Sequence, residues 1–279
     1  MVALHSVVQR LIHIFFRNKL VVNITSNKYI QNLLYILTIE LEYLQGIGSG
    51  ADITTSGEIS VVQLLQNKKK DNVIFDVGAN TGKFTSMIDS EISDVEVHLF
   101  EPQSELASQL EEAYSSDINK YVNGFALADE EGESTLYYDK EGSGFASFSN
   151  RRLDHFDIEF DHKETVHKRT LDEYCNSNDI NNIDLLKMDV EGHELDVLAG
   201  ANEMISSGSI EYITFEFGGA NIDSRIFFQD YYYFFDHYGY TIYRILPRKG
   251  LKKIDSYKEI NEKFRTANYL ASRSEKISS

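Results

Sequence analysis

The chain has 279 residues, of which 42% are hydrophobic and 25% charged, so it can form one large domain with an extension or two small domains. Its formal net charge of −17 argues against a broad nucleic-acid surface, because binding to phosphates is driven largely by Lys and Arg. A single cysteine, Cys175, excludes an internal disulfide, and nothing indicates an oxidising compartment. We therefore expect a globular, cytoplasmic protein that does not bind nucleic acid.

Residues 2–22 are apolar but are interrupted by five Lys, Arg or His side chains. Val7, Leu11, Ile14 and Phe15 fall on one face of a helix, which predicts an amphipathic helix. A secretory signal would have an unbroken apolar run, and a membrane span needs about twenty apolar residues without charges. The helix packs on the main domain, packs on a second subunit in a homo-oligomer, or makes peripheral contact with a membrane.

Two further helices are predicted before the main domain. The first covers residues 27–44 and ends at the glycine-rich tract of residues 46–50. The second begins at Ser56, which is a favourable capping residue. No linker divides the chain after residue 70, so we predict a helical extension over residues 1–70 and one domain over residues 71–279.

Residues 73–82, VIFDVGANTG, predict a buried strand that leads through a glycine turn into a helix. A dinucleotide fold would have G-x-G-x-x-G here, whereas this chain has Gly78, Asn80 and Gly82, preceded by Asp76. An acid before the turn repels phosphate but suits a ligand that carries an amine and a positive centre. S-adenosylmethionine has both, and we therefore expect it to be the cofactor.

A second strand, residues 95–100, ends at Glu101. Glu101 follows Gly82 by roughly twenty residues, the spacing at which an acid binds the ribose hydroxyls of an adenosine ligand. A third strand, residues 121–127, leads to Asp129, and the adenine should lie near that point. Asp129 is therefore predicted to belong to the cofactor site together with Glu101.

The segment that follows departs from a strict alternation of strand and helix. Residues 134–138 predict a hairpin-like insertion, and residues 142–147 form a hydroxyl-rich loop that is either a plain connector or a closure over a ligand. His155, His162 and His167 lie beyond it, and their spacing fits no standard zinc pattern. We therefore predict no metal site there.

Residues 183–188 predict a fourth strand of the sheet, which ends at Asp189, with Glu191 two residues further on. In a parallel sheet the carboxyl ends of the strands line the ligand crevice. Asp189 and Glu191 should therefore face the same crevice as Asp76 and Glu101. Three more strands complete an expected sheet of seven: residues 212–217, 240–246 and 268–271.

Taken together, these segments resemble the FkbM family of S-adenosylmethionine-dependent methyltransferases. The resemblance covers residues 71–217, and its most specific part is the DVEGHE element with the upstream TLD. Five segments carry it, in the family order: FDVGANTG at 75–82, FEP at 100–102, TLDEY at 170–174, IDLLKMDVEGHE at 183–194 and LAGA at 198–201.

The resemblance implies a class I α/β fold that is Rossmann-like, with seven mostly parallel strands, the last inserted antiparallel, and helices on both faces. It also implies O-methylation of a hydroxyl on a sugar, glycan, polysaccharide or related metabolite, with S-adenosylmethionine as the methyl donor. Carried over position by position, five residues would hold the cofactor: Asp76, Gly78, Asn80, Gly82 and Glu101. Asp189, Glu191 and His193 would face the acceptor.

A sugar hydroxyl must lose its proton to become a good nucleophile, so a base is needed within about 3 Å of it. We expect Glu191 or His193 to be that base. Alternatively, Asp189, Glu191, His193 and Glu216 bind a divalent ion that acidifies the hydroxyl. Other functions stay open: a methyltransferase acting on protein or RNA, an NAD-dependent sugar oxidoreductase, or a non-catalytic cofactor-binding module.

Overall fold

The computed structural model describes residues 2–50, 55–66 and 72–274. The chain divides into two compact units, residues 1–45 and residues 46–279. The expected boundary between residues 70 and 71 lies outside the described residues. Helix α4 (Ile59–Gln66) packs against the sheet of the second unit through Val61, Val62 and Leu65, so this helix belongs with the main domain.

The first unit consists of three helices: α1 (Val2–Phe16), α2 (Lys19–Thr25) and α3 (Lys28–Tyr43). The apolar stretch expected to form one helix is divided, because Asn18 accepts a hydrogen bond from the Leu20 N–H and so caps a new helix. Asn27 caps α3 in the same way, through the Tyr29 N–H. Among the described residues, no helix has both the length and the apolar character needed to cross a bilayer.

The second unit is built on one large sheet. Its strand order is β3-β2-β1-β7-β8-β11-β9-β10, in which β11 is antiparallel to both of its neighbours. The eight strands are β1 (Val73–Val77), β2 (Glu96–Phe100), β3 (Lys120–Asn123), β7 (Ile183–Met188), β8 (Ile210–Phe217), β9 (Thr241–Ile245), β10 (Leu251–Lys253) and β11 (Ala267–Ser272).

This topology confirms the predicted class I, Rossmann-like α/β fold with a last strand inserted antiparallel. The described sheet has a strand at each of the seven predicted places and an eighth at its edge. The third strand, predicted over residues 121–127, ends at Asn123, and residues 126–127 pair in a second sheet. The addition is β10, which has three residues and pairs only with β9. Three residues are too few to show the alternation by which a strand is recognised in a sequence.

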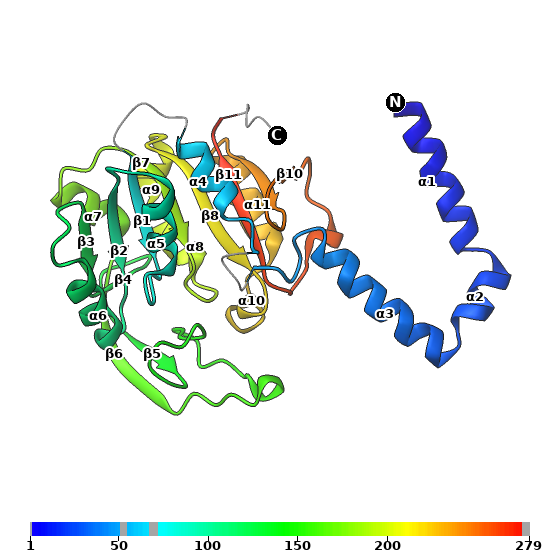
Figure 1. Cartoon of the computed structure of the whole chain (residues 1–279), viewed down its shortest axis with the longest axis horizontal. Helices are drawn as coiled ribbons and strands as arrows, with labels where there is room; N and C mark the ends of the chain where they lie inside the picture. Colours follow the sequence, from blue (N-terminus) through cyan, green and yellow to red (C-terminus); the bar gives the residue numbers. More distant parts are fainter. Residues whose placement is uncertain (1, 51–54, 67–71, 275–279) are drawn as a thin grey trace. The chain divides into compact units, whose positions relative to one another are not determined.

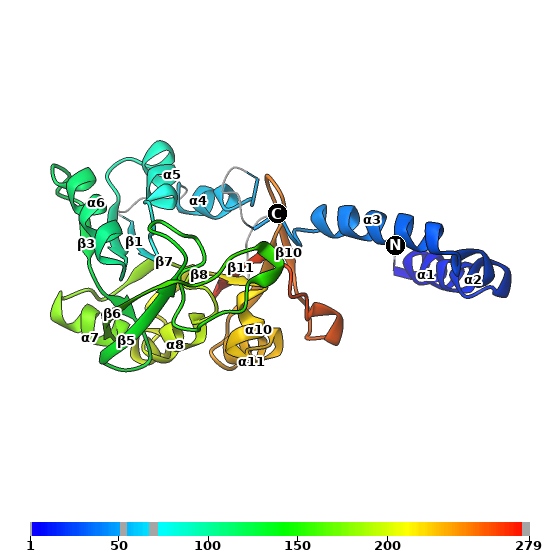
Figure 2. The same ribbon diagram turned by 90° about the horizontal axis from the view of Figure 1, so that it is seen from below.

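Helices cover both faces of this sheet (Figures 1 and 2). Alternate residues of a strand point to opposite faces: Phe75 and Val77 pack in one apolar cluster and Ile74 packs in the other. The Ile74 face is covered by α4, α5 (Lys83–Glu91) and α6 (Ser104–Tyr114). The opposite face is covered by α7 (Leu171–Ser177), α8 (Glu194–Ala199), α9 (Asn202–Ser206), α10 (Ala220–Ser224) and α11 (Phe228–His237).

A small second sheet is inserted after β3. It has the order β4-β6-β5, with bounds β4 (Ala126–Leu127), β5 (Gly132–Tyr138) and β6 (His162–Arg169), and β5 is antiparallel to β6. This confirms the hairpin-like departure expected near residues 134–138. Short 3-10 helices lie at Asp154–Phe156, between β5 and β6, and at Glu259–Asn261, before β11.

Candidate active site

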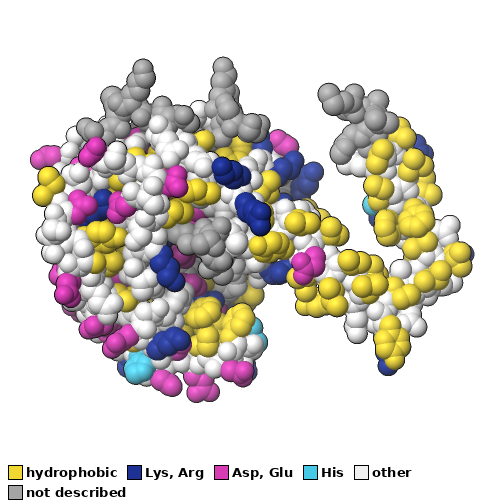
Figure 3. Space-filling model, in the orientation of Figure 1, with side chains coloured by type: hydrophobic (Ala, Val, Ile, Leu, Met, Phe, Trp, Pro, Cys, Tyr) yellow, Lys and Arg dark blue, Asp and Glu magenta, His cyan; other side chains and the backbone are white. Residues whose placement is uncertain are grey.

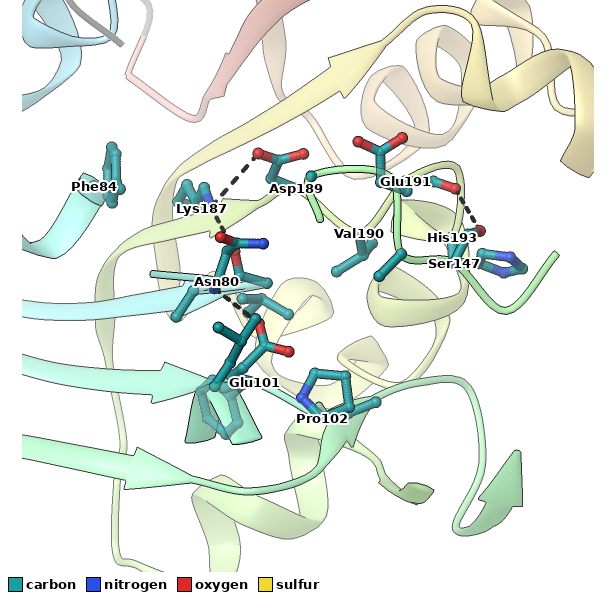
Figure 4. A pocket seen from close by; sticks show the side chains of 18 of the residues that line it. Asn80, Phe84, Glu101, Pro102, Ser147, Lys187, Asp189, Val190, Glu191 and His193 are labelled. Atoms are coloured by element: carbon teal, nitrogen blue, oxygen red, sulfur yellow. Dashed lines mark hydrogen bonds and ion pairs between the residues drawn. The ribbon is translucent and has the colours of Figure 1, made fainter. Parts of the chain in front are cut away.

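A cavity of about 470 Å³ lies at the carboxyl ends of three parallel strands. Its wall is formed by residues 78–81 after β1, by residues 101–102 after β2 and by residues 189–191 after β7 (Figure 4). The loop between β5 and β6 lines another part of it, through Ser143, Gly144, Ala146, Ser147 and Phe148. This is the usual location and size of a ligand site in an open α/β sheet.

The structure brings six of the nine predicted site residues together in the lining of this cavity. They are Gly78, Asn80, Glu101, Asp189, Glu191 and His193. Asp76, Gly82 and Asp129 do not line it. These three residues have separate environments: Asp76 is buried within β1, Gly82 begins α5, and Asp129 is exposed.

Asp76 is fully buried beneath the glycine turn. It lies opposite Lys187 in the pairing of β1 with β7, and its Oδ1 is 3.0 Å from Lys187 Nζ. Thr85 Oγ1 donates to the other carboxylate oxygen (2.8 Å). Lys187 Nζ also donates to the carbonyl of Gly78 (3.1 Å), so the pair ties the turn to the fourth strand of the parallel array.

Lys187 is a site residue that sequence reasoning missed. Burial lowers the pKa of its amine, but the carboxylates of Asp76 and Asp189 outweigh this and hold the pKa above its usual value. Its ammonium lies 5.6 Å from the centre of the Phe84 ring. A signal was available in the sequence, since a lysine inside an apolar buried strand has to find a buried partner.

Replacing Lys187 by methionine is expected to lower the free energy of unfolding by about 3–5 kcal/mol, because Asp76 would then be a buried charge without its partner. Urea unfolding followed by circular dichroism measures this. The double variant Lys187→Met with Asp76→Asn removes both charges and should recover part of the loss. A single Lys187→Met variant as stable as the unaltered protein would show that the pair does not stabilise the fold.

Gly82 and Asp129 have other surroundings. Gly82 begins α5 with a left-handed φ of 73°, and its N–H donates to the Ala79 carbonyl (2.8 Å). Gly82 is therefore a turn residue. Asp129 follows β4 on the surface, 3.9 Å from Lys168 Nζ, and lines a separate depression beside Thr170. Ala126 and Leu127, the two residues of β4, line the cavity instead.

Glu101 is the acid at the end of β2. Its carboxylate accepts hydrogen bonds from the N–H of Asn80 (2.8 Å) and from the N–H of Gln103 (2.9 Å). Burial raises the pKa of Glu101 to about 7, although these two hydrogen bonds oppose the rise. Asn80 has a left-handed φ of 48°, and its side-chain amide donates to the carbonyl of Ser143 (3.0 Å). The glycine turn, β2 and the β5–β6 loop are thus joined around one carboxylate.

Glu191 stands on the opposite wall, in a left-handed conformation with φ 51°. Its carboxylate pairs with the buried guanidinium of Arg151, which also lies 3.3 Å from Asp223. Ser147 Oγ donates to the backbone carbonyl of Glu191 (3.0 Å; Figure 4). Burial, together with Asp189, raises the pKa of Glu191, and Arg151 opposes the rise. These contacts fasten the β5–β6 loop to the end of β7.

His193 is half-buried and lines the cavity next to this loop. Its Nδ1 is 2.8 Å from Asp196 Oδ2, and its Nε2 is 3.1 Å from Ser149 Oγ. A carboxylate only accepts hydrogen bonds when ionised, so Asp196 favours the tautomer that carries the proton on Nδ1. The lone pair of Nε2 is then available to a hydroxyl. Neither Asp196 nor Ser149 was singled out from the sequence.

Glu58, which precedes α4, also lines the cavity, although it lies outside every segment on which the sequence-based site rested. Ser56 Oγ donates to its carboxylate (2.8 Å), and burial raises its pKa to about 7 while Lys187 opposes the rise. An adjoining cavity of about 30 Å³ is lined by Glu58, Asp189 and Glu216. Burial also raises the pKa of Glu216, well above its usual value.

The divalent-ion hypothesis required Asp189, Glu191, His193 and Glu216 to converge on one point. In the described ranges, no group of three or more His, Cys, Asp or Glu side chains is arranged to hold a metal ion. Glu191 is paired with Arg151, and His193 with Asp196. The geometry therefore gives the metal hypothesis no support among the residues that the structure describes.

Burial of Glu58 makes the stability of the fold depend on pH. In the unfolded chain its carboxyl loses its proton near pH 4.5, but in the folded protein only near pH 7, so the folded state loses stability as the pH rises through this interval. Glu58→Gln removes that cost and should raise the free energy of unfolding at pH 8 by up to about 3 kcal/mol, with little change at pH 4. Denaturant titrations at the two pH values test this.

The exposed Glu111 on α6 provides the matched control, because Glu111→Gln makes the same chemical change on the surface. Its free energy of unfolding should change by no more than about 0.5 kcal/mol at either pH. Equal stability of Glu58→Gln and the unaltered protein at pH 8 would contradict the raised pKa of Glu58.

The solved structures to which the chain is similar include a precorrin-6y C5,15-methyltransferase from Geobacter metallireducens GS-15, with a TM-score of 0.39 and 8% identity, covering 77% of this chain and 86% of that one. A SAM-dependent O-methyltransferase from Thermotoga maritima has a TM-score of 0.38 and 11% identity, covering 78% of this chain and 65% of that one.

Two curated proteins are similar in sequence. The 2-O-methyltransferase NoeI of Sinorhizobium fredii is 27% identical over 162 residues, which is 54% of this chain and 65% of NoeI. The AMB antimetabolite synthetase AmbE of Pseudomonas aeruginosa is 29% identical over 168 residues, 48% of this chain and 8% of AmbE. The matched region thus spans less than two thirds of either relative. The model of the methyltransferase FkbM domain matches residues 76–242, more than half of the chain, and the chain therefore belongs to the FkbM methyltransferase family.

Proposed function

We propose that the protein is an S-adenosylmethionine-dependent O-methyltransferase that acts on a hydroxyl of a sugar, a glycan or a related metabolite. The observation that carries this proposal is the cavity in which Glu101, held beside the glycine turn, faces Asp189, Glu191 and His193. Membership of the FkbM methyltransferase family supports the reaction class. The similarity to the 2-O-methyltransferase NoeI supports a hydroxyl as the acceptor.

The lining of the cavity fits this cofactor in charge and in polarity. Four of its described side chains are acidic and two are Lys, namely Glu58, Glu101, Asp189, Glu191, Lys83 and Lys187. An acidic cavity favours a ligand with an ammonium and a sulfonium. Leu106, Leu127 and Leu136 supply an apolar wall for a flat base. Glu101 would accept hydrogen bonds from the ribose hydroxyls, and S-adenosylmethionine, when bound, supplies the methyl group.

We assign the role of general base to His193 rather than to Glu191. The Glu191 carboxylate is held by Arg151, whereas Nε2 of His193 contacts only a hydroxyl, that of Ser149. An acceptor hydroxyl that takes the place of the Ser149 hydroxyl would give its proton to Nε2. Asp196 would stabilise the imidazolium that forms and keep the ring in orientation, as a carboxylate does for histidine in other enzymes.

Calorimetric titration with S-adenosylmethionine, with NAD and with a short single-stranded RNA tests this function against its rivals. We expect saturable binding of S-adenosylmethionine and no heat of binding from NAD. The acidic side chains of the cavity wall would repel the phosphates of NAD. RNA should give no binding at physiological salt, given the net charge of −17. Binding of NAD without binding of S-adenosylmethionine would overturn the proposal in favour of an oxidoreductase.

A further inference from the structure

The helices of the first unit present an unusual amount of apolar surface. Residues 7–44 contain seventeen of the twenty-four large hydrophobic side chains that are exposed in the described part of the chain. Figure 3 shows such side chains gathered along α1, α2 and α3. Neither α2 nor α3 contains a buried residue. Apolar surface on this scale marks a site of interaction with another molecule or with a membrane.

Three exposed apolar side chains of α1 share one face, whereas Ile12 and Phe16 lie away from it. Val7, Leu11 and Ile14 are separated by four and three residues, so they lie above one another on the helix. Gln9 and His13 lie on the opposite side of the same helix. Helix α1 therefore has a predominantly apolar face, formed by Val7, Leu11 and Ile14, opposite Gln9 and His13.

The charge of this segment is opposite to that of the rest of the chain. Residues 1–45 contain four cations, Arg10, Arg17, Lys19 and Lys28, and two acids, Glu40 and Glu42, which both lie near the end of α3. The chain as a whole has 44 acidic residues and a formal net charge of −17. The first unit is thus apolar and basic, whereas the chain as a whole is acidic. This combination is typical of helices that lie on an anionic bilayer surface.

Other occupants of the apolar face fit less well. The same unit of a second copy would bring a second net positive charge against the first. The second unit has only seven exposed large hydrophobic side chains among its described residues, spread between residues 118 and 260, so it offers no comparable apolar surface. An anionic bilayer supplies both an apolar layer and negative charge. Because no described helix is able to cross a bilayer, the contact would lie in the interface.

We propose that residues 2–45 bind the surface of a membrane that contains anionic phospholipid, with the apolar face of α1 in the interfacial layer. Phe15 and Phe16, at the end of α1, would lie at the level of the headgroups, where aromatic rings are favoured. The proposal does not depend on the identity of the cofactor or on the reaction. It also assigns the segment a role outside the part of the chain that the family model matches.

Vesicle flotation with the full chain tests the proposal. We expect the protein to float with vesicles of phosphatidylcholine and phosphatidylglycerol, and to bind vesicles of phosphatidylcholine alone much more weakly. Replacing both Arg10 and Arg17 by Gln should weaken binding to the anionic vesicles by about twentyfold, since each cation near the surface contributes roughly a factor of five. Binding of the unaltered protein should also fall as salt is added.

Two variants with the same change of charge separate the apolar face from the polar face. Leu11→Asp places a carboxylate on the apolar face and should abolish flotation, whereas Gln9→Asp places it on the polar face and should only weaken binding. The thermal midpoint of the second unit, followed by circular dichroism, should be the same in both variants. A shared loss of this transition would show a folding defect, and the comparison would then use Phe15→Ser against Gln9→Ser.

Two outcomes would overturn the proposal. The first is a full chain that stays with the unbound fraction for both kinds of vesicle. The second is a stable dimer in light scattering that Leu11→Asp, but not Gln9→Asp, converts to a monomer, because the apolar face would then be covered by a second copy. Failure of methyl transfer alone would leave vesicle binding unaffected, so the two proposals are tested separately.

Discussion

Replacing His193 by alanine is expected to lower kcat by about two to four orders of magnitude, the range over which a general base contributes to catalysis. Its Nε2 lines up with the hydroxyl of Ser149, and Asp196 holds the ring through Nδ1 on the other side. The affinity for S-adenosylmethionine should be nearly unchanged, because Glu101 is on another strand. Steady-state kinetics and calorimetry on the same preparation measure the two quantities.

Asp196 and Glu191 supply the comparison variants for His193. Asp196→Asn keeps the shape of the side chain but removes the charge that would stabilise the imidazolium, so we expect a smaller fall in kcat, about tenfold to a hundredfold. Its pH–rate profile should also shift, which a purely structural change would not produce. Glu191→Gln weakens the ion pair with Arg151 and should chiefly raise KM. Turnover of His193→Ala at the unaltered rate, with a lost rate in Glu191→Gln, would transfer the role of base to Glu191.

Replacing Glu101 by glutamine is expected to weaken binding of S-adenosylmethionine by about tenfold to a hundredfold, since a hydrogen bond to a charged group contributes about 1.5–3 kcal/mol. The ionised carboxylate is the form that would accept hydrogen bonds from both ribose hydroxyls. Burial raises its pKa to about 7, so the affinity of the unaltered protein should fall as the pH drops from 8 to 6. The side-chain amide of the Glu101→Gln variant does not titrate, and the affinity of this variant should vary much less over the same interval.

Glu105 on α6 is the matched control for Glu101, because it is exposed and lies only four residues away. Glu105→Gln should bind S-adenosylmethionine as the unaltered protein does at both pH values. If Glu101→Gln instead keeps both the affinity and the pH dependence of the unaltered protein, the acid at the end of β2 does not bind the cofactor.

The central strands and the crevice could be predicted because both depend on local patterns. Each central strand is a short apolar run that ends at an acid or a glycine, and the carboxyl ends of parallel strands meet at one edge. Glu101 and Asp189 each follow such a run directly, and both line the cavity. The hairpin-like insertion was visible for the same reason, since it breaks the alternation of strand and helix.

The partners of the site residues could not be predicted, because they depend on contacts between distant parts of the chain. Asp76 lies directly opposite Lys187 because of the register in which β1 pairs with β7. This register cannot be read from the sequence. Arg151 reaches Glu191 from a loop whose path follows no repeating pattern. Glu58 enters the cavity from a segment that was interpreted as part of a helical extension.

The contacts of Asp76 give this residue a structural role that differs from the one expected from the sequence. From the sequence, Asp76 was the main reason to expect a cationic cofactor. In the structure it is buried against Lys187 and Thr85, and it acts on the cavity by holding the Gly78 carbonyl in place through the lysine. The acids that face the cavity itself are Glu58, Glu101, Asp189 and Glu191. The expectation of a cationic ligand therefore rests on residues from four different segments.

The most direct measurement is mass spectrometry of a panel of sugars and glycans after incubation with the protein and S-adenosylmethionine that carries an isotopically labelled methyl group. The account predicts a product heavier by one labelled methyl group in place of a hydroxyl hydrogen, formed by the unaltered protein and lost in both His193→Ala and Glu101→Gln. Label that appears only on nitrogen or carbon of an acceptor, or on RNA or protein, would contradict the proposed O-methylation of a sugar or related hydroxyl.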